Sequence, residues 1–238
     1  MPENKRALPP AGPSQTLSRG LRALEVIADA EKPIGMAELA ERLGLHRSIT
    51  YRIVRTLEEH RLVVRTAGGG LVPGTRLAAL ARTVARDLQS AALPELTAAA
   101  NELGMTAFVA VLDADEVIAL VSVEPRHAVA PVAQRPGTRH PLHRGAPGTA
   151  IQAALTQQER AALGDERLRD EAFFRDFPGY ATSHDEVIKG MSSVAVPLRV
   201  PAQPAAALAV VYLDRSTDTA VVAARLRQAA AAVLRELG

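Results

Sequence analysis

The chain has 238 residues, of which 47% are hydrophobic, so it can bury the core of one large domain or two small ones. It contains no Cys, which excludes disulfide bonds, thiolate metal sites and a cysteine nucleophile. Aromatic residues make up only 3% of the chain, which argues against a surface that stacks single-stranded bases. The formal net charge is +2, but residues 1–76 carry +4 and residues 77–238 carry −2. This asymmetry favours a polyanionic partner for the first third of the chain alone.

The sequence predicts no segment that spans a membrane. Its two most apolar windows, Val117–Val123 and Ala205–Leu213, are far shorter than the roughly 20 residues of a bilayer-spanning helix. Residues 1–13 hold four prolines and no apolar stretch, so they predict a flexible arm instead of a signal peptide. With the absence of Cys, these features indicate a cytoplasmic protein without a membrane partner.

Residues 14–60 contain three segments with helical periodicity. The first has a serine at its start and apolar residues at helical spacing, and it ends before Pro33. The second, Met36 to Leu43, carries a full apolar stripe and is followed by Gly44, which suits a tight turn. The third runs from about Arg47 to His60. Its expected core face is formed by Ile49, Ile53 and Leu57.

The opposite face of the third helix is basic and bears hydroxyl groups. After this helix, two short β-rich segments, Leu62–Arg65 and Leu71–Pro73, flank three glycines and predict a two-stranded wing. A helix, a glycine turn, a second helix and a wing are typical of a winged helix-turn-helix domain, here residues 14–76, that binds double-stranded DNA. The candidate DNA contacts are Arg47, Ser48, Thr50, Tyr51, Arg52, Arg55 and Arg65.

The remaining two thirds mix helices and strands. One helix is expected over Leu77–Leu88, with an interruption at Pro94 and a second helix from Leu96 to Leu103. The expected strands are Phe108–Leu112, Val117–Val123, Val129–Gln134, Tyr180–Ser183, Ser192–Leu198 and Ala205–Leu213. Further helices are expected over Gly145–Leu155 and Thr217–Leu237. This order predicts an α+β sheet covered by helices and not a doubly wound parallel sheet.

Three separated stretches resemble the IclR family of bacterial transcriptional regulators. Residues 17–63 read LSRGLRALEVIADAEKPIGMAELAERLGLHRSITYRIVRTLEEHRLV and are similar to the family's winged-helix opening. Residues 137–155, GTRHPLHRGAPGTAIQAAL, and residues 179–198, GYATSHDEVIKGMSSVAVPL, look like its two effector-domain signatures. Their order and spacing extend the resemblance from about Ser14 to Leu237.

The resemblance implies a domain organisation and a set of partners. It implies a linker helix over residues 77–92 and a GAF-like α/β domain over residues 93–238 that binds an effector and forms oligomers. Family members act as homodimers, or dimers of dimers, on pseudo-palindromic operators, often in the catabolism of organic or aromatic acids. The expectation is therefore a transcriptional regulator, acting as a repressor, with no cofactor and no enzymatic activity.

The resemblance also places the effector pocket. The implied pocket residues lie at a turn, in the second signature and on a neighbouring strand: Ala146, Pro147, Ser183, Met191, Ser193, Ala209 and Val211. This chain departs from the family in that Thr149 stands where a Lys is frequent, and Pro147 removes one N–H donor from a helix start. The pocket is thus expected to be more apolar than one for a small carboxylate. The predicted effector is a hydrophobic or aromatic acid.

Three other interpretations remain open at this point. His140, His143 and His184 could form a metal site, although no carboxylate or Cys completes a ligand pattern and His143 suits a partly buried structural role better. Ser193, His143 and Asp185 are the residue types of a hydrolase triad, but no Gly-x-Ser-x-Gly elbow surrounds any Ser. A third alternative is a GAF-like ligand-binding module without a DNA function, against which the winged helix argues.

Overall fold

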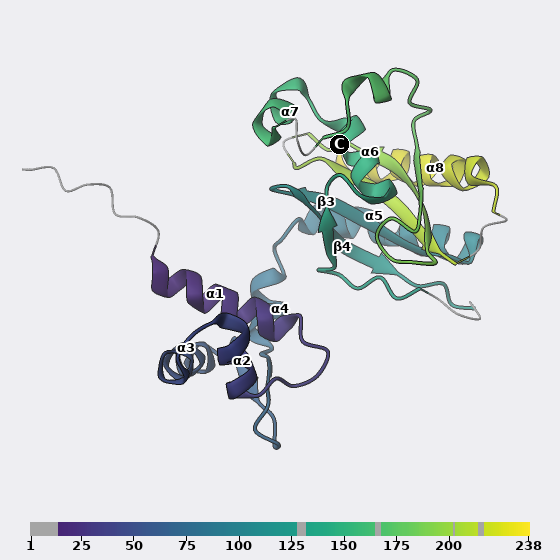
Figure 1. Ribbon diagram of the computed structural model, residues 1–238. Coiled ribbons are helices and arrows are strands. Elements are labelled where there is room, and N and C mark those ends of the chain that lie inside the picture. Colours follow the sequence, from purple (N-terminus) through teal and green to yellow (C-terminus); the bar gives the residue numbers. More distant parts are fainter. Residues whose placement is uncertain (1–13, 128–131, 165–167, 202, 214–216) are drawn as a thin grey trace, which may run out of the picture. The chain divides into compact units, whose positions relative to one another are not determined.

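The computed structural model describes residues 14–127, 132–164, 168–201, 203–213 and 217–238. The chain divides into two compact units, Met1–Val84 and Ala85–Gly238, which are described separately. Figure 1 shows the helices of the first unit in purple and blue, and the sheet of the second in teal and green. The arm expected over residues 1–13 lies outside the described residues.

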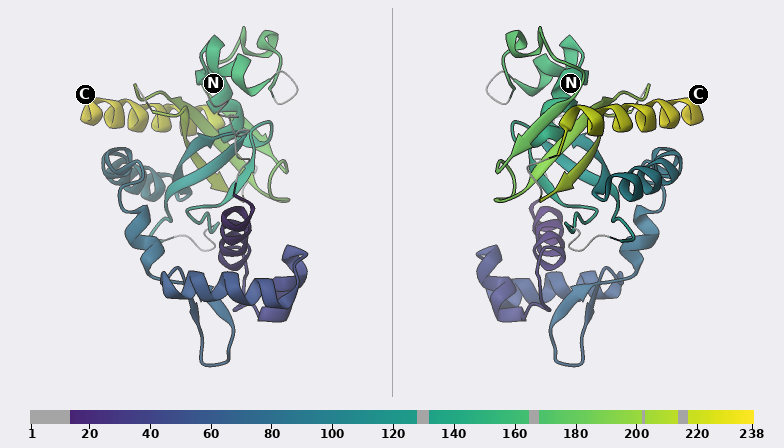
Figure 2. Two further views of the ribbon diagram at one scale, coloured as in Figure 1. Left: turned by 90° about the vertical axis from the view of Figure 1, so that its left-hand side faces the viewer. Right: turned by 90° about the vertical axis from the view of Figure 1, so that its right-hand side faces the viewer.

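The N-terminal unit begins with three helices and a two-stranded wing. These elements are α1 (Gln15–Ala28), α2 (Met36–Leu43), α3 (Arg47–Glu59), β1 (Val63–Arg65) and β2 (Leu71–Pro73), and a short fourth helix follows them within the unit. The hydroxyl of Ser14 accepts a hydrogen bond from the backbone N–H of Leu17 and so caps α1, as the sequence suggested. Gly44 ends α2 with φ +63°, a conformation that glycine adopts without a steric cost. The wing extends away from the helices as a hairpin in Figure 2.

The core of this unit decides which face of α3 points outward. Thr50, Ile53, Val54 and Leu57 are the buried residues of α3. They pack on a cluster that includes residues of α1, α2 and the wing. The expected core face was therefore wrong at one position, because Ile49 is 38% exposed. The true core face follows the spacing i, i+3, i+4, i+7 from Thr50.

The helical region after the wing differs from the expected continuous helix. It consists of α4 (Arg76–Ala81) and α5 (Arg86–Leu103), and residues 82–85 form turns between them. Ala85 has φ +43°, a left-handed conformation that ends the helical path there. Pro94, expected to interrupt a helix, lies inside α5, where it is exposed. The break thus lies about ten residues earlier than expected.

The C-terminal unit is built on one antiparallel sheet. Its strands are β3 (Thr106–Asp113), β4 (Glu116–Val123), β5 (Arg139–Pro141), β6 (Ala181–His184), β7 (Ser192–Leu198) and β8 (Ala206–Tyr212). Their order across the sheet is β5-β4-β3-β8-β7-β6. The structure confirms five of the expected strands, including β7 to the residue. The strand expected over Val129–Gln134 is not formed by its described residues, and β5 takes the edge beside β4.

Helices cover both faces of this sheet. Its helical elements besides α5 are α6 (Gly145–Ala154), α7 (Gln157–Leu163), the 3₁₀ turn η2 (Glu171–Phe174) and α8 (Thr219–Leu237). Helices α5 and α8 pack on each other and on one face, and α6 packs on the other (Figures 1 and 2). The sequence predicted α6 and α8 but neither α7 nor η2.

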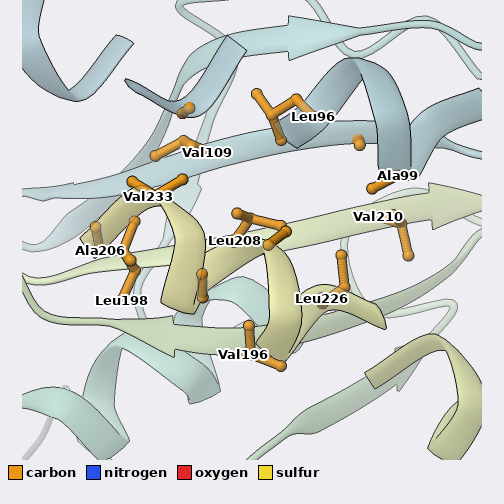
Figure 3. Packing of buried hydrophobic residues seen from close by; sticks show 14 of the residues in the cluster. Leu96, Ala99, Val109, Val196, Leu198, Ala206, Leu208, Val210, Leu226 and Val233 are labelled. Atoms are coloured by element: carbon orange, nitrogen blue, oxygen red, sulfur yellow. The ribbon is translucent and has the colours of Figure 1, made fainter. Parts of the chain in front are cut away.

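Strand β8 shows why both faces bury apolar residues. Ala206, Leu208 and Val210 point towards α5 and α8, where they meet Leu96 and Leu226 (Figure 3). The alternate residues of β8 belong to the second cluster, beneath α6. A strand buried on both sides reads as a continuous apolar run, which is how its sequence reads. The fold therefore agrees with the expected α+β class, with an N-terminal helix-turn-helix unit.

Candidate functional site

Helix α3 presents a basic outer face. Arg47, Ser48, Arg52 and Arg55 are exposed, and the side chain of Tyr51 is 55% exposed. The side of α3 that contains Thr50 and Leu57 packs into the core, so these exposed residues point away from it. Guanidinium and hydroxyl groups on a helix of this kind can donate hydrogen bonds to phosphates and to base edges in a major groove.

The N-terminus of α3 is open to an anion. Its first turn contains no acidic residue, and the side chain of the N-cap residue His46 caps none of the backbone N–H groups, since its Nδ1 lies 3.4 Å from the Ser48 hydroxyl instead. The first backbone N–H groups and the positive end of the helix dipole therefore point outward, beside Arg47 and Ser48. This end of α3 is a suitable phosphate-binding position.

The wing places another cation near α3. The guanidinium Nε of Arg65 lies 2.7 Å from a carboxylate oxygen of Glu58, and Nε of Arg55 lies 3.1 Å from one of Glu59. Both pairs are partly exposed, so each contributes little to folding and can open towards a phosphate. Gly69 has φ +80° in the turn between β1 and β2, where a residue with a side chain would be strained.

One predicted DNA contact is corrected by the structure. Thr50 is fully buried, and its hydroxyl lies 3.3 Å from the carbonyl oxygen of His46, to which it donates. A side chain enclosed in the core cannot reach DNA. The other six predicted contacts are exposed and lie on α3 or at its neighbouring wing strand.

The C-terminal unit has a cavity of about 270 Å³ at the start of α6. Its walls come from β3, β5, α6, β6, β7 and β8, and from the segment between β6 and β7. The lining residues are Phe108, Gln134, Thr138, Arg139, His140, Gly145, Pro147, Ser183, Glu186, Val187, Ile188, Met191, Ser192, Ser193 and Val211. A small concave site with apolar walls and a few polar groups is the usual form of a ligand pocket.

Five of the seven expected pocket residues line this cavity: Pro147, Ser183, Met191, Ser193 and Val211. Ala146 and Ala209 do not, and both are fully buried. The side chain of Ala146 forms no part of the cavity wall, but its backbone N–H donates a hydrogen bond to the Ser183 hydroxyl. Ala209 stands in the middle of β8, paired with Phe108 on one side and Ala195 on the other. The expectation for these two alanines is therefore corrected.

Two glycines, Gly145 and Gly148, let the backbone of α6 lie close to neighbouring segments of the chain. Gly145 has φ +78°, and a Cβ atom there would lie 2.8 Å from Val187 Cγ2. A Cβ atom at Gly148 would lie 2.3 Å from the carbonyl oxygen of Leu142. Real Cβ atoms do not approach a backbone oxygen this closely, so Gly148 is required for packing. Gly145 is required mainly by its left-handed backbone, because the neighbouring Val187 methyl group belongs to a side chain that can move.

Polar groups of the protein itself meet the N-terminus of α6. The N–H of Gly145 donates to Glu186 Oε2 at 2.8 Å, and the N–H of Ala146 donates to Ser183 Oγ at 2.9 Å. Arg169 Nη2 lies 3.7 Å from Glu186 Oε2, and Nε of Arg169 donates to the Thr149 hydroxyl at 3.2 Å. Arg169 thus supplies a cation beside the position where the family frequently has a Lys.

Sequence reasoning missed the residues that complete the cavity. Phe108 comes from β3, His140 from β5, and Val187 and Ile188 from the segment before β7. Val187 and Ile188 are exposed apolar residues inside the second signature, which is the one signal that could have found them. Burial lowers the pKa of His140, which favours a neutral imidazole in the cavity at neutral pH.

The three histidines considered for a metal do not form one site. Among the described residues, no group of three or more His, Asp or Glu side chains could hold a metal ion. His143 is exposed, which corrects the expectation of a partly buried position. His184 Nδ1 is 2.9 Å from the Ser192 hydroxyl, and this contact joins β6 to β7. Its Nε2 is 2.9 Å from Oδ2 of the adjacent Asp185.

The hydrolase arrangement is not assembled either. The hydroxyl of Ser193 donates to the carbonyl oxygen of Val210 at 2.8 Å, and no hydrogen bond joins it to His143 within the described residues. A nucleophilic Ser needs a base within hydrogen-bonding distance, so this geometry does not activate Ser193.

No helix in the described part of the chain is long and apolar enough to cross a membrane.

Comparisons with known proteins agree with both units. The model described as the IclR helix-turn-helix domain matches residues 16–67. The model described as the C-terminal region of the bacterial transcriptional regulator IclR matches residues 80–173. The transcriptional repressor IclR of Escherichia coli strain K12 is 31% identical over 164 residues, which cover 65% of this chain and 58% of the relative.

Two solved structures share the fold along nearly the whole chain. A transcriptional regulator from Alicyclobacillus acidocaldarius has 25% identity and a TM-score of 0.78, and the match covers 94% of this chain and 99% of that one. An IclR homologue from Microbacterium hydrocarbonoxydans, solved in complex with 4-hydroxybenzoate, has 23% identity, the same coverages and a TM-score of 0.78. The chain therefore belongs to the IclR family of transcriptional regulators, which are DNA-binding transcription factors and not enzymes.

Proposed function

We propose that this protein is a repressor that binds a pseudo-palindromic operator as a homodimer, or as a dimer of dimers, under the control of an apolar or aromatic effector. The observation that carries the proposal is the outer face of α3. Its open N-terminus, three exposed arginines and exposed hydroxyl groups stand on one side of the helix. That arrangement matches the charge and the groove of double-stranded DNA.

The DNA contacts divide into two groups. Ser48, Tyr51 and Arg52, near the start of α3, are proposed to contact base edges or phosphates. Arg47, Arg55 and Arg65 are proposed to contact phosphates, because they lie at the helix edge or on the wing. Phosphate contacts fix the position of the protein, and base contacts supply the sequence preference.

An apolar groove supports the dimer. Leu17 and Leu21 of α1 are 62% and 52% exposed, and they face Ile49 of α3 across a groove of about 740 Å³. Apolar side chains grouped in this way usually mark an interaction surface. A second copy of the chain that contacts Leu17 and Leu21, and leaves Arg52 at the edge of the groove free for DNA, would bring two α3 helices to one duplex. Their contacts would then repeat at half-sites a helical turn or more apart.

The effector proposal rests on the cavity beside α6. Phe108, Met191 and Val211 give it apolar walls, and the Microbacterium homologue was solved with an aromatic ligand, 4-hydroxybenzoate. Relatives named as repressors, such as the Escherichia coli protein, favour repression as the sign of regulation. Effector binding is proposed to shift the protein between states that differ in operator affinity.

The DNA proposal is tested by fluorescence anisotropy with the DNA upstream of the protein's own gene and a shuffled duplex as control. Six phosphate contacts per dimer would lower the operator affinity about a thousandfold between about 50 and 200 mM salt. Equal affinity for both duplexes at every salt concentration would overturn the proposal and favour a ligand-binding module without a DNA function.

A further inference from the structure

The start of α6 has no backbone donor left for a ligand carboxylate. Gly145 donates to Glu186 at 2.8 Å, and Ala146 donates to Ser183 at 2.9 Å. The third residue, Pro147, has no N–H to donate. A helix N-terminus is normally a place where an anion binds, but here the chain's own groups occupy that position.

The group that occupies this position is itself an anion. Glu186 lines the cavity, and its side chain is held at α6 by Gly145 and by Arg169, whose Nη2 lies 3.7 Å from the carboxylate. The guanidinium of Arg144 also donates to the backbone carbonyl of Glu186, which fixes the segment. A ligand carboxylate placed at the start of α6 would therefore meet a negative charge at close range.

The neighbouring cations are already engaged by the protein: Arg169 pairs with Glu186 and donates to Thr149, and Arg144 donates to the backbone carbonyl of Glu186. Arg139 lines the cavity, but its guanidinium is 3.4 Å from the carboxylate of Glu116. Burial holds the pKa of His140 below its ordinary value, so the imidazole adds no positive charge at neutral pH. The remaining polar lining consists of neutral hydroxyl and amide groups on Gln134, Thr138 and three serines. These groups suit hydrogen bonds to a ligand that carries no charge.

We infer that the effector is an uncharged aromatic or apolar molecule, and that Glu186 sets this preference by filling the anion position at the start of α6. This inference rests on the proposed function, which makes the cavity the effector site. It narrows the apolar or aromatic effector to a neutral compound, in place of the hydrophobic or aromatic acid expected from the sequence. Ser183 and Pro147 act in the same direction, because the first engages one donor and the second lacks one.

The test compares probes that differ only in charge. Benzamide and benzoate, and the larger pair 2-naphthamide and 2-naphthoate, are titrated into the full-length protein at pH 7.5 by calorimetry. We expect the amide of each pair to bind at least about tenfold more tightly than the acid, because the acid gains no donor and meets Glu186. A wild-type protein that prefers the acids would overturn the inference.

Three variants locate the cause of the preference. Glu186→Gln keeps an oxygen that can accept from Gly145 but removes the charge, so it should reduce the preference for the amide about tenfold. Pro147→Ala restores one N–H without touching Glu186, and it should tighten the binding of the acids alone. The control Glu171→Gln makes the same charge change at a carboxylate outside the cavity lining and should preserve the wild-type ratio.

The outcomes separate this inference from the proposed function. If both Glu186→Gln and Pro147→Ala retain the wild-type ratio of amide to acid affinity, Glu186 does not set the preference. If none of the four probes binds the wild-type protein while operator binding persists, the cavity is not the effector site. In that case the effector part of the proposed function fails, and the present inference fails with it.

Discussion

The N-termini of α3 and α6 use the same backbone chemistry in opposite ways. At α3 the first turn has no acidic residue and no side-chain cap, and exposed arginines stand beside it. At α6 the first donors are engaged by Glu186 and Ser183, and the next residue is a proline. One helix start is left open to an external anion, and the other is closed by the protein.

This difference shows that a helix N-terminus does not define an anion site by itself. Whether its donors are free depends on residues far away in the sequence, such as Glu186, which lies 41 residues after Gly145. In this chain the open start belongs to the unit with a surplus of positive charge, and the closed start belongs to the unit with a negative balance. The charge asymmetry thus agrees with the local geometry of both helices.

The largest change in stability is expected from disrupting the close contact between Gly148 of α6 and the backbone of Leu142. Gly148→Ala would place a Cβ atom 2.3 Å from the carbonyl oxygen of Leu142. Because backbone has to move, we expect a loss of about 3 kcal/mol in the free energy of unfolding, the upper end for overpacking. Urea denaturation followed by circular dichroism measures it.

A glycine in open space provides the control for that substitution. Gly20 lies within α1 and has no atom within 4 Å of an added Cβ. Gly20→Ala should stabilise the protein by about 0.5–1 kcal/mol, because glycine costs this much inside a helix. If the two substitutions changed the free energy of unfolding equally, the close contact between position 148 and the Leu142 carbonyl oxygen would not be the cause of the loss.

The second effect concerns the open helix start. Arg52→Ala should weaken operator binding about 10- to 100-fold, the range for one arginine contact to DNA. Arg235→Ala removes the same charge from the exposed last turn of α8 and should leave that affinity unchanged. Anisotropy titrations at a fixed salt concentration compare the two variants. An equal loss in both would indicate a general charge effect in place of a contact by α3.

A third pair of variants separates the buried and exposed hydroxyls of α3. Thr50→Val removes a buried hydroxyl that donates to the His46 carbonyl, which should cost about 1 kcal/mol of stability. Its operator affinity should stay within about twofold of wild type, since Val fills the same space. Ser48→Ala should do the reverse, with weaker DNA binding and unchanged stability. If the Thr50→Val variant had normal stability and weak DNA binding, Thr50 would be a DNA contact after all.

The smallest effect is a pH dependence in the C-terminal unit. Burial lowers the pKa of folded His140 below its ordinary value of 6.5, so the unfolded chain binds this proton more readily. The resulting loss of stability begins as the pH falls through 6.5 and grows until the folded pKa is reached. His140→Gln should therefore lose less thermal stability than wild type between about pH 7.5 and 5.5. Parallel losses in both proteins would assign the dependence to other groups.

Most of the regular fold could be predicted from apolar spacing. The apolar residues of α2 recur at the helical period, and β8 is an unbroken apolar run of strand length, so both elements give strong signals. The outer face of α3 was predicted apart from Thr50, which is buried, and Ile49, which is exposed. A threonine whose hydroxyl is satisfied by the carbonyl four residues earlier can be buried, and sequence spacing alone does not show this.

Other features depend on tertiary contacts that no local pattern carries. Pro94 reads as a break, yet it is exposed on α5, where the carbonyl that loses its partner can face water. The actual break is at Ala85, a residue type that gives no such signal. The cavity was predicted only where a signature marked it, because Phe108 reaches it through the pairing of β3 with β8.

The pairing of α5 with α8 has a practical consequence for engineering. Arg225, near the start of α8, forms an ion pair with Glu102 at the end of α5, and Gly238 shares a surface hollow with Asp87. The two helices are therefore antiparallel, and Asp87 and Gly238 line the same hollow. A short loop could join Gly238 to Arg86, so new chain ends could be opened elsewhere on this unit. Circular permutants of residues 85–238 could then carry a reporter inserted near the cavity.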